Sequence, residues 1–362
     1  MSDKNVIDRE KVLNWQIISK YRNLLFGVAI LWIMSLHSLN YTVIDRWKGF
    51  EKYRLLDSIH QLVDLGGAGV DIFLFLSGIG LYYSFSKCPD LKLFYGKRLK
   101  RVLIPYLIIG VANWVIRDIV YGLNPDGLLE DVFWVTFYTE GKSTYWYIVF
   151  ILAMYLIYPL IYYMLESKYR SINLALLLFL ALGLIYLLYT RDYETYRNIE
   201  KAVARVPIFI VGCYWGKIVK SGKPMHEGWV LYALIVPWIG GFFQYFGRDG
   251  GIPWKVTSRL WYGMLAIGVC ILFSLLFSIT ELGLVGKLLN LMGTLSLELY
   301  LIHIAMKGLL KLWRPEYKQW GMGKTCLLYF LVVMVGSLLI SILYHNISQK
   351  IGQKISSAKR AQ

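Results

Sequence analysis

The first long apolar stretch of the chain reads Leu24-Leu25-Phe26-Gly27-Val28-Ala29-Ile30-Leu31-Trp32-Ile33-Met34-Ser35-Leu36-His37-Ser38. Its composition suits a lipid environment, where an imidazole must find a polar partner, a water-filled cavity or a chemical role. His37 is therefore the first candidate functional residue. Charges of both signs precede the stretch and no small-residue cleavage site follows it, so we expect a retained helix and not a signal peptide.

Composition extends this interpretation to the whole chain. The 362 residues are 57% hydrophobic and their mean hydropathy is +0.50, well above the values of soluble globular proteins. About 20 residues are needed to cross roughly 30 Å of hydrocarbon, so the sequence predicts an all-α, polytopic transmembrane bundle of about ten spans. The expected spans are 22–40, 68–86, 102–120, 144–165, 172–189, 205–220, 229–246, 260–280, 288–308 and 325–346.

The order of the spans predicts a domain organisation and a topology. We expect a cytosolic N-terminal segment over residues 1–21, one membrane domain over 22–346 and a basic cytosolic tail over 347–362. The cytosolic side then receives the basic run 87–101, in the direction of the positive-inside rule. The chain is accordingly expected to be a multi-pass protein of the cell membrane with both termini in the cytosol.

The net charge of +16 raises the question of nucleic acid binding. The basic residues lie mostly at the ends of the expected spans, where such side chains contact lipid headgroups. We therefore expect membrane lipid, and no nucleic acid, as their partner. The chain has four cysteines: Cys88, Cys213, Cys270 and Cys326. They follow no paired spacing, so the sequence predicts neither a metal site nor a disulfide framework.

Two further segments carry polar groups that an apolar bundle must accommodate. Residues 66–80 are rich in glycine and contain Asp71 and Ser77, an arrangement that close helix packing with one capping aspartate also explains. In residues 97–106, Arg98 and Arg101 are three apart and share a helix face with Lys97 nearby. Two guanidiniums on one face suit a phosphate, and a topology anchor is the alternative. Pro105 predicts a helix kink just beyond.

These segments resemble, in wording and order, the acyltransferase 3 family of integral membrane acyltransferases. The resemblance rests on the histidine that ends the first helix, on Gly69-Val70-Asp71 with its Ser77-Gly78, and on Lys97-Arg98-x-x-Arg101 with Pro105. It extends to Tyr145-Trp146-Tyr147 with Tyr155 and Pro159, and to the segment from Ser296 to His303. The similar elements run from about residue 20 to about residue 310 and so cover nearly the whole chain.

The resemblance implies that an acetyl group, with succinyl as an alternative, moves from cytosolic acyl-CoA to a hydroxyl of a sugar or glycan on the opposite side. By matching position it implies that His37 is the catalytic residue, acting as a base or an acyl relay, and that Arg98 and Arg101, with Lys97, bind the donor. No metal is expected. The residues expected to support the site are Asp71, Ser77, Trp146, Glu298 and His303. Of these, Asp71 or Glu298 is a candidate for orienting His37, as the third member of a triad does.

One position departs from the family pattern. The family usually has an arginine eleven residues before its histidine, on the same helix face, and this chain has Phe26 there. Arg22 lies about 22 Å of helix rise from His37 and is rotated by about 60° from its face. The sequence therefore predicts only a partial replacement by Arg22, and an inactive member of the family stays an alternative.

A second class of function remains open. A transporter or exporter of a glycan or lipid-linked sugar also fits about ten helices with a polar interior. Broken helices in matched halves, the usual sequence pointer to transporters, are not evident. The sequence leaves the acceptor, the choice between acetyl and succinyl, and the oligomeric state undetermined.

Overall fold

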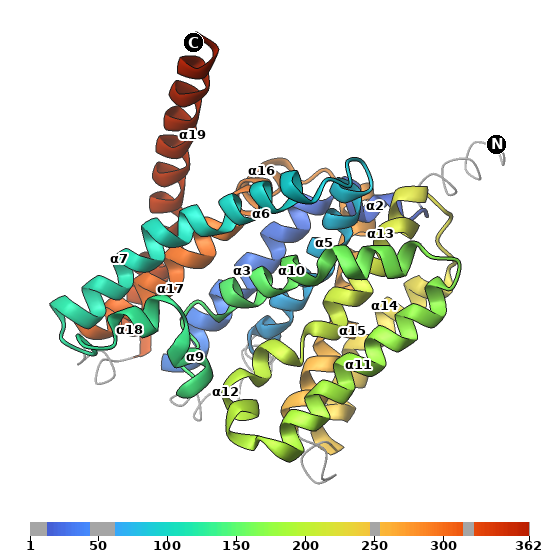
Figure 1. Cartoon of the computed structure of the whole chain (residues 1–362), viewed down its shortest axis with the longest axis horizontal. Coiled ribbons are helices and arrows are strands. Elements are labelled where there is room, and N and C mark those ends of the chain that lie inside the picture. The colour runs from blue at the N-terminus through green and yellow to red at the C-terminus, as the bar shows by residue number, and fades with distance from the viewer. Residues whose placement is uncertain (1–12, 44–61, 247–253, 314–321, 362) are drawn as a thin grey trace.

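The computed structural model describes residues 13–43, 62–246, 254–313 and 322–361, and these form a helical bundle (Figure 1). Within these ranges there is no β-strand beyond a single bridge between Asn14 and Pro224. The all-α expectation is confirmed. The long helices are α3 (Arg22–Val43), α5 (Ala68–Phe85), α6 (Leu91–Pro105), α10 (Trp146–Glu166), α11 (Arg170–Arg191), α12 (Tyr193–Val203), α13 (Val206–Ser221), α14 (Gly228–Phe246), α15 (Trp254–Ile279), α16 (Gly283–Thr294), α17 (Ser296–Trp313) and α19 (Ser337–Ala361).

Short helices complete the described chain. They are α2 (Gln16–Lys20), α7 (Val111–Trp114), α8 (Leu128–Val132), α9 (Val135–Thr139) and α18 (Met322–Tyr329). Both α8 and α9 belong to the connection of residues 121–145, which joins the third expected span to α10. This connection packs at one end of the bundle, near α12.

When helices are counted as spans by their length and composition, the structure has fewer spans than the sequence predicts. In the described chain, seven helices are long and apolar enough to cross a membrane, and the pair α16 and α17, bent by 80°, is an eighth if counted as one span. Two further apolar helices, Arg22–Ser38 and Gly228–Gly240, are shorter. Every expected interval coincides with one of these helices, but the count of ten is not confirmed.

The kink expected at Pro105 takes the form of a change in backbone hydrogen bonding. Asp90 caps α6 by accepting a 2.7 Å hydrogen bond from the amide of Leu93. Pro105 cannot donate to the helical ladder, and π-helical turns over Tyr106–Gly110 and Val115–Val120 follow it. These turns carry the third span into the 121–145 connection.

Helix α5 lies at the centre of the bundle and approaches α13 closely. A Cβ atom added at Gly78 would stand 2.5 Å from the backbone nitrogen of Cys213, so no larger residue fits there without displacing a helix. Small residues allow this kind of backbone contact in membrane bundles. The close approach fixes α5 between α3 and α13, and α5 thereby supplies a wall to both of the cavities described below.

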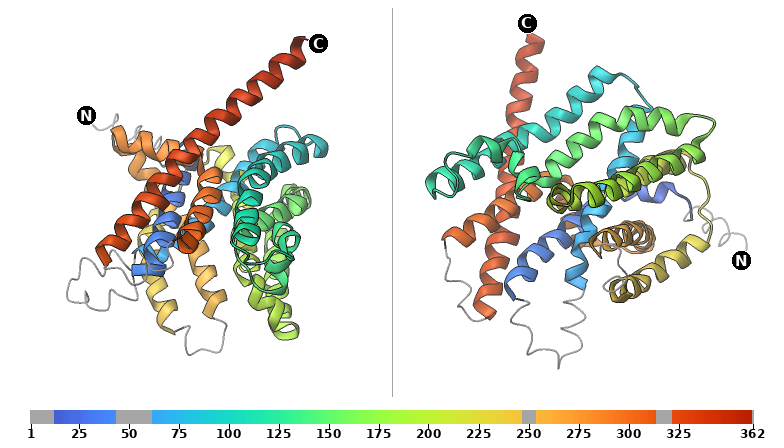
Figure 2. Two further views of the ribbon diagram at one scale, coloured as in Figure 1. Left: turned by 90° about the vertical axis from the view of Figure 1, so that its left-hand side faces the viewer. Right: turned by 60° about the horizontal axis from the view of Figure 1, so that its bottom comes forward.

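Segments assigned to the cytosol on sequence grounds lie together at one end of the bundle. The amide of Trp15 donates to the carbonyl of Lys223 at 3.1 Å, and Lys220 Nζ donates to Ser86 Oγ at 2.8 Å. Arg98 reaches Ser84 Oγ at the same end. We call this the N-terminal end. The C-terminal part of α19 extends well beyond the bundle (Figure 2).

Candidate active site

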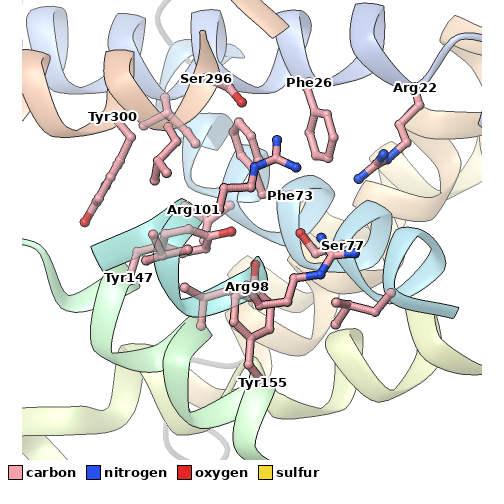
Figure 3. A pocket seen from close by; sticks show the side chains of 16 residues that line it. Arg22, Phe26, Phe73, Ser77, Arg98, Arg101, Tyr147, Tyr155, Ser296 and Tyr300 are labelled. Carbon is pink, nitrogen blue, oxygen red and sulfur yellow. The ribbon is translucent and has the colours of Figure 1, made fainter. Parts of the chain in front are cut away.

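A narrow cavity opens between α3, α5, α6, α10 and α17 near the N-terminal end of the bundle (Figure 3). Its volume is about 90 Å³. Three guanidiniums enter it, from Arg22 on α3 and from Arg98 and Arg101 on α6, and we call it the arginine cavity. The rest of the wall is mainly aromatic and apolar and includes Phe26, Phe73, Tyr147, Tyr155 and Tyr300.

Arg22 packs against Phe26, the residue that departs from the family pattern. Its guanidinium carbon lies 4.9 Å from the centroid of the Phe26 ring, which stacks in turn on Phe73 at 5.1 Å. Gly80 provides the room, because a Cβ atom there would stand 2.6 Å from Arg22 Nη2. The Nε atom of Arg22 is buried without a hydrogen-bond partner in the described chain. Arg22 therefore lines the arginine cavity with a guanidinium whose Nε has no acceptor among the described residues.

The donor-site residues expected from the sequence divide into two groups. Arg98 and Arg101 line the arginine cavity, as does Ser77 on α5. Lys97 is exposed on α6 and does not line it. The basic motif thus presents two of its three expected side chains to this space.

A second, wider cavity of about 450 Å³ lies toward the other end of α3. His37 lines it, and so does Trp146 at the start of α10, so we call it the histidine cavity. Cationic side chains from several helices also line it: Arg117, Lys201, Arg205, Arg259, Lys307 and Lys311. Its wall is much more polar than that of the arginine cavity.

His37 contacts a second histidine. Its Nδ1 atom lies 2.9 Å from Nε2 of His303 on α17, and the two rings are stacked with centroids 5.2 Å apart. His303 is fully buried, and its Nδ1 lies 2.7 Å from the carbonyl oxygen of Leu299. A carbonyl only accepts hydrogen bonds, so Nδ1 of His303 carries the proton that it donates. In the neutral pair, Nε2 of His303 then accepts from Nδ1–H of His37, which leaves the lone pair of His37 on Nε2.

The two candidate acids for orienting His37 have other partners. Asp71 is fully buried and accepts a 3.1 Å hydrogen bond from Nε of Arg205, its ion-pair partner. Glu298 lies 3.5 Å from Nδ1 of His345 on α19. The partner that the structure gives to His37 is therefore the imidazole of His303 and neither carboxylate.

Arg205 holds the wall of the histidine cavity together. It lies in the short break between α12 and α13, and besides Asp71 it donates to the carbonyls of Lys201 and Gly67 at 2.8 and 3.2 Å. Its guanidinium carbon lies 5.3 Å from the ring centroid of Trp146. Asp71 and Trp146, both expected to support the site, thus both contact Arg205. Arg205 was not among the residues predicted from the sequence.

The connection of residues 121–145 supplies another part of this wall. Ser143 and Thr144 line the histidine cavity, and the preceding Lys142 binds both carboxylate oxygens of the buried Asp131, at 2.7 and 3.0 Å. Burial by itself raises the pKa of Asp131, but hydrogen bonds from Lys142, Thr136 and Asn124 outweigh it and hold the pKa below its ordinary value. The charged carboxylate anchors the connection where it meets the cavity.

The arginine and histidine cavities adjoin each other. Both are bordered by Ile33 of α3, Val70 of α5 and Tyr300 of α17. Each of these three helices contributes to both cavities, with α3 lining one at Arg22 and the other at His37. The helix rise between these two residues is about 22 Å. We call the shared border of Ile33, Val70 and Tyr300 the neck.

Some residues of the histidine cavity could have been identified from their spacing in the sequence. Lys307 and Lys311 follow His303 at steps of four, so all three lie along one face of α17. Glu298 precedes His303 by five residues, about 140° around the helix, and faces α19 instead. The spacing identifies the cationic stripe, whereas Arg117 and Arg259 come from distant segments and carry no comparable signal.

The described residues contain no group of three or more His, Cys, Asp or Glu side chains arranged to hold a metal ion. Comparison with curated proteins and with solved structures gives no match. Comparison with protein families matches residues 21–346 to the acyltransferase 3 family, described as an acyltransferase domain. The match includes both cavities and every site residue discussed above, and the chain therefore belongs to the acyltransferase 3 family.

Proposed function

We propose that this protein transfers an acetyl group, with succinyl as the alternative, from acyl-CoA in the arginine cavity to a hydroxyl of a cell-surface or exported glycan in the histidine cavity. The observation that carries the proposal is the adjoining of the two cavities at the neck, with the His37 and His303 pair on the acceptor side. We place the arginine cavity at the cytosolic face of the cell membrane, where acyl-CoA is made.

The arginine cavity suits the donor by charge and by shape. Arg22, Arg98 and Arg101 are cations that bind phosphate oxygens well, and the unpartnered Nε of Arg22 is a donor without an acceptor in the described chain. The cavity is smaller than the 300 to 1,000 Å³ typical of ligand pockets. Its volume suits the acyl thioester end of the donor, with the rest of the thin pantetheine arm and the nucleotide outside its mouth near the arginines.

The histidine pair suits proton removal from an acceptor hydroxyl. A sugar hydroxyl is a weak nucleophile at neutral pH and needs a base within hydrogen-bond reach. Nε2 of His37 takes the hydroxyl proton as the oxygen attacks the thioester carbon. A carbon–oxygen bond forms, the carbon–sulfur bond breaks, and the proton on His37 passes to the departing thiolate. His303 acts as a positioning residue that holds His37 in the tautomer with a free Nε2.

The experiment compares cells that carry wild-type protein with cells that carry His37→Ala, and measures their surface and exported glycans by mass spectrometry. We expect an added acetyl or succinyl mass only with wild-type protein, while the variant inserts normally and binds CoA with unchanged affinity. His37→Gln serves as a second variant that keeps a polar side chain. Full acylation by either variant would contradict the assignment of the base, and an unacylated glycan that still reaches the surface only with protein present would favour transport.

A further inference from the structure

The histidine cavity is lined by cations from four separate parts of the fold. Lys307 and Lys311 come from α17, Arg259 from α15, and Arg117 from the π-helical turn after α7. Lys201 of α12 and the neighbouring Arg205 complete the set. No aspartate or glutamate is among the described residues that line this cavity.

Three of the nearby carboxylates are placed behind the cavity wall. Asp71, Asp118 and Glu200 are buried, and none of them lines the cavity. Asp71 forms its ion pair with Arg205. The Nε atom of Arg259 is buried and has no hydrogen-bond partner within the described ranges, and its guanidinium lies 5.6 Å from the ring centroid of Tyr262. The charge that faces the cavity is therefore positive.

A cavity lined by one sign of charge and walled by a low-dielectric bundle concentrates ions of the opposite sign. Topology does not explain these cations, because they lie near the end of the bundle opposite the N-terminal segment and the Arg98 cluster. Arg205 is buried and paired with Asp71, so the attraction for an anion comes mainly from the five partly exposed cations. The arrangement therefore indicates an anionic ligand in this cavity.

Helix geometry places the cations at a useful distance from the base. Lys307 and Lys311 lie about 6 Å and 12 Å of helix rise beyond His303, which contacts His37. A ligand that presents a hydroxyl to Nε2 of His37 would therefore carry its anionic group one to two helix turns away. Carboxylate or phosphate oxygens on the same or the adjoining sugar ring satisfy this spacing.

We infer that the acceptor is acidic: a hydroxyl-bearing sugar that carries a carboxylate or a phosphate group within about one sugar unit of the acylated oxygen. The inference rests on the proposed function for its acceptor role. It adds that electrostatic attraction to Lys307, Lys311 and Arg259 selects acidic over neutral sugars and sets the orientation of the ring before proton removal.

Binding to purified full-length protein in nanodiscs tests the inference without requiring catalysis. The probes are methyl glucuronide for a carboxylate, glucose 1-phosphate for a phosphate and methyl glucoside as the neutral match. We expect either acidic probe to raise the unfolding temperature more than the neutral one, and high salt to reduce the difference. The acidic probe with the larger shift identifies the type of anion.

Matched variants locate the effect. Lys307→Gln with Lys311→Gln is expected to weaken binding of the acidic probe about tenfold or more, and Arg259→Gln to weaken it less. Lys92→Gln changes an exposed lysine on α6 that lines neither cavity and should leave binding unchanged. CoA affinity should stay the same in all of them. Weakened CoA binding in the double variant would overturn the inference, because the histidine cavity would then hold the donor.

Glycan mapping supplies a second, independent arm. In cells that carry the wild-type protein, we expect the added acyl mass on a sugar that bears an acidic group or adjoins one. An acyl group on a neutral residue of an uncharged glycan would overturn the inference while leaving the proposed acyl transfer intact. Acylation that persists in His37→Ala would instead contradict the proposed function, and the probe-binding result would stand on its own.

Discussion

The arginine cavity and the histidine cavity share helices α3, α5 and α17 but differ in size and in the chemistry of their walls. The first has a volume of about 90 Å³ and a wall that is mainly aromatic and aliphatic, with three guanidiniums entering it. The second has a volume of about 450 Å³, and six cations and a histidine line it. A thin chain with a charged end fits the first, and a polar ring fits the second. One set of helices therefore builds two cavities of different size and chemistry, which the proposed function assigns to two chemically different substrates.

Changing the histidine pair should produce the largest effect and should be confined to the histidine cavity. We expect His303→Ala to lower the rate of acyl transfer by about 100-fold or more, because His37 loses the acceptor that fixes its tautomer. His303→Gln should retain part of the rate, since its amide oxygen can accept from Nδ1 of His37. The positioning role of His303 is tested by measuring the rate of acyl transfer and its pH profile, with CoA affinity as the control. An unchanged rate and pH profile in His303→Ala would remove the positioning role.

Changing the basic motif should affect the arginine cavity alone. Replacing both Arg98 and Arg101 with Gln should weaken acyl-CoA binding by roughly 2 to 4 kcal/mol, taking about 1 to 2 for each charge-assisted contact. If the motif only anchors topology, CoA affinity will be unchanged and the cysteine accessibility of residues 87–101 will shift. Titration with CoA and cysteine labelling of the same variant separate these results.

Substituting Arg22 tests whether its side chain replaces the missing family arginine in the arginine cavity. Arg22→Gln should weaken acyl-CoA binding by about 1 to 2 kcal/mol. Lys97→Gln, a change on the exposed face of α6, should have no effect. Gly80→Ala should weaken binding in the same direction as Arg22→Gln, because the added methyl group displaces the guanidinium. Equal CoA affinities in Arg22→Gln and Lys97→Gln would show that Arg22 does not bind the donor.

Position 26 tests whether the arginine cavity lies beside α3. The Phe26 side chain lines this cavity, so a charged residue there would enter polar space and not lipid. We expect Phe26→Arg to fold and to keep measurable activity, and the exchange of Arg22→Phe with Phe26→Arg to relieve crowding of two guanidiniums. Expression level and CoA affinity are the measurements. Misinsertion of Phe26→Arg alongside normal Phe26→Leu would indicate an uncompensated charge, which costs about 2.5 to 3.5 kcal/mol at membrane depth.

The smallest effect is expected at the wall of the histidine cavity. Because the folded protein holds the pKa of Asp131 below its ordinary value, the carboxylate stabilises the 121–145 connection above the unfolded pKa of about 3.9. That stabilisation is lost as the pH falls through the lower, folded value. Asp131→Asn should therefore unfold at a lower temperature than wild type at neutral pH, and the difference should shrink in acid. A difference that does not change with pH would contradict this account.

Much of the fold could be predicted because apolar run length determines what crosses a bilayer. All ten expected intervals coincide with helices, and π-helical turns follow Pro105, whose missing amide interrupts the backbone ladder. The bend between α16 and α17 was not predicted, because the residues around Leu295 include no proline and the interval 288–308 reads as one apolar run. Such a break depends on packing against other helices, which a single sequence does not encode in its periodicity.

The motifs of the candidate site could be predicted from the sequence. The contacts between side chains on different helices could not. His37, Arg98 and Arg101 follow from short patterns, and the structure places His37 at one cavity and both arginines at the other. The contact between His37 and His303 joins residues 266 positions apart, so no local spacing predicts it. The position of Arg22 over Phe26 depends on the space left by Gly80 of another helix. Contacts of this kind arise from helix packing, which is why the sequence predicted only a partial replacement by Arg22.

The neck of Ile33, Val70 and Tyr300 has a consequence for the membrane itself. If water filled both cavities and this border at once, protons would cross the bilayer and the cell would lose its electrochemical gradient. Isoleucine and valine side chains favour a dry constriction, which blocks hydrated ions, whereas an acyl thioester is apolar enough to enter it. In the proposed transfer the neck would therefore admit the acyl thioester and hold back protons. Replacing Val70 with Ser in proteoliposomes should then increase the passive proton flux.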